Sequence, residues 1–344
     1  MDTAAENLEK RAALYTTIYS QAYSACGRYL ATSDNFGRIS IFDTNALGDS
    51  LQTNGARKPA QTFQGGGESP LYALVTVKDY LVSGGSNGIS LWKWDSLIRR
   101  NKDEKLQSVW STQMLAVRSS SLSPEINCLS YTEQNNLLCG ACGDGTVRVW
   151  DLETGTEKEV LAAHKDMVLS VATGTSILAS ASEDGTVKTW DYRKLQKATH
   201  SFEPSSNKSL SQPAGKWIGA VGFDSGEEWL ACGGGPKPGL WHLKSLHLAS
   251  ALNTNGATTH DLLFHDDELI SVGNDSRVHH WSLNGDARSH IPSAVGTLYS
   301  VASNSPSAKT QMMTTAGCSS VVDVYTNMKY RAFSLSLEDP GVLA

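Results

Sequence analysis

Three residues of the sequence supply the parts of a serine hydrolase: His164, Ser180 and Asp184. In such an enzyme the imidazole takes the proton of the serine hydroxyl, and a carboxylate orients the imidazole. Catalysis also requires that the serine oxygen reach a substrate carbonyl. The same side chains, together with Trp190, could instead hydrogen-bond in series and satisfy buried polar groups. The elements that carry these residues decide between the two interpretations.

Two other patterns resemble ligand sites but lack essential parts. Cys139 and Cys142 have CxxC spacing, yet no second CxxC or histidine pair accompanies them, as a zinc site would require. The glycine runs Gly65–Gly67 and Gly233–Gly235 lack the Lys and Ser or Thr of a phosphate-binding loop, so we expect turns there. These two patterns therefore predict no metal and no cofactor.

The charge pattern argues against a nucleic-acid interface. The 344 residues carry a net charge of −6, and non-specific binding to nucleic acid depends mainly on Lys and Arg. The basic run Arg99–Lys102 is short and is expected to be a solvated loop. We therefore expect any RNA contact to be indirect or weak.

Cysteine usage and hydropathy predict a soluble intracellular protein. Six cysteines are scattered through the chain, whereas disulfide scaffolds are small and rich in cysteine. Met1–Lys10 contains no apolar run of the kind found in secretory signals, and no apolar stretch approaches eighteen residues. No membrane contact is expected.

An internal repeat indicates the fold. Val147–Asp151 and Val187–Asp191 lie forty residues apart, and each follows a turn of the form Gly-Asp-Gly or Glu-Asp-Gly. Apolar and polar residues alternate after each turn, as in a half-buried strand entered through a tight hairpin. A repeat of about this length, ending in Trp-Asp, is typical of WD-repeat propellers.

Weaker copies of the unit extend the repeat along the chain, with spacings of 40 to 58 residues. Each ends a short strand with an aromatic residue. The seven aromatics are Phe42, Trp92, Trp150, Trp190, Trp241, Trp281 and Tyr325. The sequence thus predicts an all-β, seven-bladed WD-repeat propeller, in which Trp94 lies in a turn after the second aromatic.

The predicted organisation is one propeller domain over residues 15–337. Residues 1–14 are expected to form a short N-terminal helix, with Leu8, Ala12 and Tyr15 on one face against the propeller rim. Residues 338–344 are expected to be a flexible tail. Polar segments at Asn45–Gln61, Arg99–Pro124 and Glu203–Lys216 are predicted to be loops.

The repeat favours the structural interpretation of the hydrolase-like residues. In a WD repeat, a loop histidine, a second-strand serine, a turn aspartate and a third-strand tryptophan form one hydrogen-bonded network. Only the fourth blade has the whole set, namely His164, Ser180, Asp184 and Trp190. Phe42 has no polar hydrogen and Tyr325 has no indole, so apolar packing is expected to stabilise the first and last blades.

Three stretches resemble the family of the sixth subunit of the THO complex, and the resemblance runs in order from about residue 15 to 337. The stretches are Lys216–Gly219, Cys232–Pro236 leading to Leu240–Leu243, and Val322–Asn327 leading to Tyr330–Leu335.

This resemblance implies a non-catalytic scaffold in the nucleus that acts in messenger RNA processing and export. It also implies assembly with other THO subunits, especially the fifth and seventh. The cytoplasm is a second expected location.

A further stretch is similar to the box of WD-repeat substrate receptors in cullin-type ubiquitin ligases. It comprises Ile177–Asp184 and the sequence Trp190-Asp191-Tyr192-Arg193. The resemblance implies that Asp191 and Arg193 contact the damaged-DNA-binding adaptor. A chance match is the alternative, since short motifs recur by coincidence.

Overall fold

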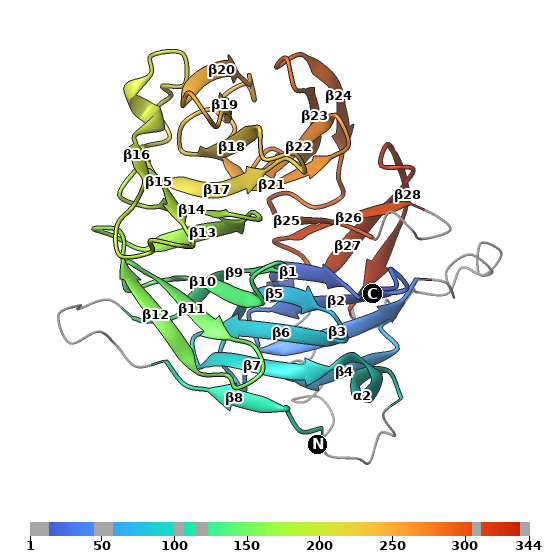
Figure 1. The fold of residues 1–344 in the computed structure, drawn as a ribbon. Coiled ribbons are helices and arrows are strands. Elements are labelled where there is room, and N and C mark those ends of the chain that lie inside the picture. The colour runs from blue at the N-terminus through green and yellow to red at the C-terminus, as the bar shows by residue number, and fades with distance from the viewer. Residues whose placement is uncertain (1–13, 45–57, 100–105, 115–122, 305–310, 338–344) are drawn as a thin grey trace. The chain divides into compact units, whose positions relative to one another are not determined.

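The computed structural model describes residues 14–44, 58–99, 106–114, 123–304 and 311–337. These residues form seven four-stranded sheets, each built from four consecutive strands. The fold is a seven-bladed β-propeller (Figure 1), which confirms the predicted fold class. Among the described residues, no helix is both long and apolar enough to cross a bilayer.

The chain divides into two compact units. The first contains residues 1–85, 90–111 and 293–344, and therefore the first and last sheets and most of the second. Its strands are β1 (Ile18–Tyr23), β2 (Tyr29–Asp34), β3 (Arg38–Asp43), β4 (Gln61–Gln64), β5 (Leu71–Val77), β6 (Tyr80–Gly85), β7 (Gly88–Lys93), β8 (Trp110–Thr112), β25 (Leu298–Ser303), β26 (Met312–Gly317), β27 (Val321–Thr326) and β28 (Tyr330–Ser336).

The second unit contains the third to sixth sheets, coloured from green to orange in Figure 1. Its strands are β9 (Ile126–Thr132), β10 (Leu137–Cys142), β11 (Thr146–Asp151), β12 (Glu157–Ala162), β13 (Val168–Thr173), β14 (Ile177–Ser182), β15 (Val187–Asp191), β16 (His200–Phe202), β17 (Ile218–Phe223), β18 (Trp229–Gly234), β19 (Gly239–His242), β20 (His247–Ala251), β21 (Thr259–His265), β22 (Glu268–Gly273), β23 (Arg277–Ser282) and β24 (Ala287–Pro292). Within this unit, β13 contacts β9 and β17, and β17 contacts β21.

The Gly-containing turns join the second and third strands as the repeat predicts. In the fourth sheet β14 and β15 are antiparallel, and Ala181 pairs with Val187 across the turn. Gly185 has φ of 83°, and Gly145 in the preceding sheet has φ of 82°. This left-handed conformation strains residues that carry a Cβ, so glycine is favoured at this position of the turn.

The seven predicted aromatics lie in equivalent places. Each is in the third strand of its sheet, and each is at most 7% exposed. In the second unit, Trp190 packs in a cluster with Val149, Leu161 and Val168, which joins the third sheet to the fourth. The third and fourth sheets thus stack on each other through apolar side chains.

The C-terminal sheet is complete without a strand from elsewhere. β28 pairs with β27, as the alternating pattern predicts. This sheet packs on the first through a cluster that includes Ile18, Phe42, Val322, Val324 and Leu335. Packing of side chains therefore joins the last sheet to the first within this unit.

Several local expectations were wrong. Trp94, expected in a turn, begins the short helix α2 (Trp94–Ile98), because its indole is buried against the first unit's core. The segment expected as a loop before Pro124 contains β8. Gly233 and Gly234 lie in β18 and not in a turn. A Cβ on Gly234 would collide with the backbone of Trp217 and Gly219, so the close strand approach requires glycine.

The terminal segments lie mostly outside the described residues. Leu14 and Tyr15 are helical and exposed, so Tyr15 does not pack as expected. The rest of the predicted N-terminal helix, with Leu8 and Ala12, lies outside the described residues. The predicted tail, residues 338–344, also lies outside them.

Candidate protein-binding site

The fourth blade brings the hydrolase-like residues together. The indole N–H of Trp190 donates to Ser180 Oγ at 3.1 Å, and Ser180 Oγ lies 2.8 Å from Nε2 of His164. Nδ1 of His164 lies 3.1 Å from the Asp184 carboxylate, which also accepts a hydrogen bond from Thr186 Oγ1 at 2.6 Å. The side chains of Trp190, Ser180, His164 and Asp184 thus form one chain of hydrogen bonds that links two strands, the turn between them and the preceding loop.

The electrostatics favour a neutral imidazole in this network. Burial lowers the pKa of His164, although Asp184 opposes the shift. Burial alone would raise the pKa of Asp184, but hydrogen bonds from His164, Thr186 and the backbone hold it well below its usual range. A neutral His164 with its proton on Nδ1 donates to Asp184 and accepts from the Ser180 hydroxyl, so every polar group has a partner.

The order of contacts is that of a catalytic triad, but the surroundings are those of a core. Ser180 is fully buried, and its oxygen already accepts the Trp190 N–H. A substrate carbonyl could approach this oxygen only if the blade opened. The geometry therefore suits a structural network that fixes the blade.

Other blades contain part of the network, which the sequence reasoning missed. Trp92 donates to Ser83 at 2.9 Å, and Trp281 donates to Ser271 at 2.9 Å. In the last sheet, Thr315 donates to the hydroxyl of Tyr325 at 3.4 Å. Each partner hydroxyl lies nine or ten residues before the aromatic in sequence. That spacing was the signal that could have identified these pairs.

The Asp191 and Arg193 pair lies at the surface where β15 ends. Arg193 Nε donates to Asp191 Oδ1 at 2.9 Å, and Arg193 Nη2 donates to Asp191 Oδ2 at 2.6 Å. The Arg193 side chain is 82% exposed. This hydrogen-bonded ion pair lowers the pKa of Asp191 to about 2. The guanidinium is therefore held in place and open to a partner.

Other blades also have an aspartate at the end of the third strand that forms an ion pair with a basic residue. Asp43 in the first sheet binds Arg28 at 3.0 Å and 2.6 Å, and Asp151 in the third binds Lys158 at 2.6 Å. Ion pairing at the end of the third strand is thus a recurring feature of the chain. The geometry of Asp191 and Arg193 alone does not distinguish a binding site from this general pattern.

The CxxC cysteines lie in β10 with their thiols free. Burial raises the pKa of Cys139 and of Cys142 to about 12. Reactive cysteines are exposed and have a lowered pKa, so these thiols are placed as core groups. Within the described ranges, no three His, Cys, Asp or Glu residues are arranged to hold a metal ion.

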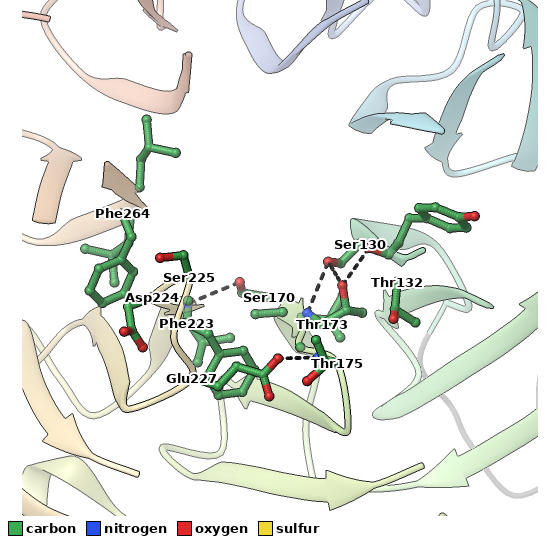
Figure 2. A pocket seen from close by; sticks show the side chains of 18 of the residues that line it. Ser130, Thr132, Ser170, Thr173, Thr175, Phe223, Asp224, Ser225, Glu227 and Phe264 are labelled. Carbon is green, nitrogen blue, oxygen red and sulfur yellow. Dashed lines mark hydrogen bonds between the residues drawn. The ribbon is translucent and has the colours of Figure 1, made fainter. Parts of the chain in front are cut away.

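A pocket of about 650 Å³ lies in the second unit, along the first strands of its four sheets. We call it the inner-strand pocket; residues from β9, β13, β17 and β21 and the turns after three of these strands line it. Figure 2 shows Ser130, Thr132 and Thr173 on one side and Phe223, Asp224 and Phe264 on the other. No sequence motif marked this pocket.

Comparison with known proteins places the chain in a family. It is 35% identical to human "THO complex subunit 6" over 94% of this chain and 93% of the relative. It is 33% identical to zebrafish (Danio rerio) "THO complex subunit 6 homolog" over 94% of this chain and 98% of the relative. The chain belongs to the THO complex subunit 6 family.

More distant members of the THO complex subunit 6 family match as well. The Drosophila melanogaster protein is 29% identical over 81% of this chain and 77% of its own length. Residues 94–176 match a family model described as the WD40 domain of anaphase-promoting complex subunit 4. The match runs from α2 to the turn after β13 and so includes the whole third blade. The WD40 match agrees with the repeat architecture of the structure.

Proposed function

We propose that this chain is a non-catalytic scaffold subunit of a THO complex, located in the nucleus, and that it supports messenger RNA processing and export. The observation that carries the proposal is the similarity to THO complex subunit 6 along nearly the whole chain. The buried Ser180 supports a binding role, because the only triad-like set recognised in the sequence is closed to substrate.

Other THO subunits, especially the fifth and seventh, are the proposed partners. A propeller offers them a rigid body with exposed turns and edge strands, on which extended segments or helices dock. The edge strand β12 is one such surface, since Glu157–Val160 are all exposed. Contact with RNA is then made through the complex and not through this chain.

The test is affinity purification of the full tagged chain from nuclei, followed by size-exclusion chromatography and mass spectrometry. We expect the fifth and seventh THO subunits to be recovered in near-equal amounts with the chain. Elution of the nuclear chain alone, or a cytoplasmic location without THO subunits, would contradict the proposal.

A second proposal concerns the surface pair on the fourth blade. We propose that Arg193, presented by Asp191, contacts the damaged-DNA-binding adaptor of a cullin-type ubiquitin ligase, so that the chain also serves as a substrate receptor. The supporting observation is the 82% exposure of the Arg193 side chain, whose guanidinium is fixed by two hydrogen bonds. Fixed, exposed arginines are frequent energetic centres of interfaces.

The chain offers a matched control for this proposal. Arg28 makes the same forked contact with Asp43 but is only 47% exposed. We expect Arg193→Ala to abolish adaptor recovery while Arg28→Ala leaves it unchanged, and both variants to retain THO subunits. Equal adaptor recovery with wild type and Arg193→Ala would refute the receptor proposal and leave the scaffold proposal standing.

A further inference from the structure

The inner-strand pocket has an unbalanced charge. Its lining contains four carboxylates, from Glu133, Asp224, Glu227 and Asp261, and no Lys, Arg or His. Among the described residues, no ion pair neutralises Glu133, Asp224 or Glu227. A concave site lined by one sign of charge concentrates ions of the opposite sign. The pocket is therefore suited to a cation.

The carboxylates differ in how they are held. The carboxylate oxygens of Asp224 accept hydrogen bonds from the backbone N–H groups of Gly226, Glu228 and Trp229, within the turn that contains Asp224. Glu227 is half-buried and accepts the backbone N–H of Thr175 with one oxygen. Its other oxygen has no hydrogen-bond partner among the described residues. Glu227, in the turn after β17, is thus anchored to Thr175 in the turn after β13 and has one oxygen left to accept a hydrogen bond.

Aromatic rings complete the lining on the same side. Phe223 and Phe264 are half-buried at the ends of β17 and β21 and are drawn near Glu227 and Asp224 in Figure 2. The Phe264 ring lies beside Gly222, where an added Cβ would be 3.8 Å from the ring, an ordinary contact distance. Guanidinium groups are weakly hydrated and planar, so they stack on such rings while pairing with carboxylates.

The opposite side supplies neutral oxygens on a rigid frame. Ser130 Oγ lies 2.8 Å from Thr173 Oγ1 and accepts the Thr173 backbone N–H at 3.2 Å, which ties β9 to β13. Ser170 Oγ accepts the Val221 N–H at 3.2 Å and ties β13 to β17. These cross-strand bonds fix the shape of the pocket before a ligand arrives, which reduces the entropy cost of binding.

We propose that the inner-strand pocket binds an arginine side chain presented by an extended segment of a partner protein. The guanidinium pairs with the open oxygen of Glu227 and with Glu133, and its plane packs on the phenyl rings. Arginine fits better than lysine because it offers both a planar face and a fork of donors. This inference concerns a site on this chain and does not depend on membership of a THO complex.

The test uses the full chain with 13C-labelled methyl groups and short capped peptides as probes. N-acetyl-Ser-Arg-Ser-amide is titrated against wild type, and the lysine and citrulline analogues serve as controls. We expect shifts confined to the methyls of Leu262, Leu263, Val171 and Val221, which line the pocket. Citrulline keeps the shape of arginine without its charge, so it should give no shifts, and lysine should bind more weakly.

Two variants separate the pocket from general surface charge. Glu227→Gln keeps an oxygen for the Thr175 N–H but removes the charge, and Glu228→Gln removes the charge of an exposed neighbour outside the lining. We expect about fivefold weaker binding for Glu227→Gln and no change for Glu228→Gln. Glu133→Gln, at an exposed position, should weaken binding without risk to the fold.

The outcomes are decisive in both directions. Shifts that are confined to the pocket, depend on the guanidinium and weaken in both Glu227→Gln and Glu133→Gln support the proposal. Equal shifts with the citrulline or lysine probe, shifts at other methyls, or unchanged binding in the two variants would overturn it. So would the absence of shifts with the arginine probe.

Discussion

Removal of the Ser180 hydroxyl is the sharpest perturbation of the structural network. Ser180→Ala leaves two buried groups without their partner, the Trp190 N–H and His164 Nε2. Each buried unsatisfied polar group costs about 1–3 kcal/mol, so the variant should lose about 2–6 kcal/mol of unfolding free energy. Ser271→Ala leaves only the Trp281 N–H, and its expected cost is about 1–3 kcal/mol.

Equilibrium urea unfolding measures this difference, with circular dichroism and tryptophan fluorescence as paired probes. Ser225→Ala is the surface control, since Ser225 is exposed, and its effect should be within about 0.5 kcal/mol. If Ser180→Ala proves no more destabilising than Ser271→Ala, the reasoning from two unpaired groups is wrong. A hydrolytic activity that disappears in Ser180→Ala before stability changes would contradict the structural interpretation altogether.

Three further perturbations test separate features. Burial lowers the pKa of His164 in the folded state, so its neutral form contributes stability that is present above about pH 6.5 and is lost as the pH falls through the folded-state pKa. In thermal scans between pH 7.5 and 5.5, His164→Asn should therefore lose less stability than wild type. A thiol reagent should label two cysteines of the native chain quickly, the exposed Cys26 and Cys318, and all six after unfolding. Fast labelling of four or more would contradict the buried positions of Cys139, Cys142 and Cys232. Gly234→Ala should cost about 1–3 kcal/mol in urea unfolding because its Cβ collides with backbone, while Gly296→Ala, where a Cβ meets nothing, should change stability by less than about 1 kcal/mol.

The fold was largely predictable because its signals are local. A glycine turn followed by alternating residues defines a hairpin within about ten residues, and the seven aromatics all fall in third strands. The outer strand β8 carried no such signal. Its three residues, Trp110–Thr112, do not alternate clearly, and the strand is specified by pairing with β7 rather than by its own sequence.

The site was predictable only where one repeat contains all its parts. His164, Ser180, Asp184 and Trp190 lie within 27 residues, so their spacing suggested the network that the structure contains. The inner-strand pocket combines β9 and β21, which are more than a hundred residues apart in sequence. No single stretch carries its charge or its rings, and only the arrangement of four sheets brings them together.

The construction of every sheet from one uninterrupted stretch has a consequence for how the chain folds. The backbone pairing of each sheet connects residues close in sequence, so a sheet can form soon after its stretch leaves the ribosome, without waiting for distant partners. The packing of the last sheet on the first is different, since the hydrogen bond from Gln21 Nε2 to the carbonyl of Ser300 spans 279 residues. Closing a loop of this length costs conformational entropy, and the contact can form only after the last sheet has been synthesised. The first sheet therefore remains uncovered on one side until then, which leaves its apolar face open to non-native contacts during synthesis.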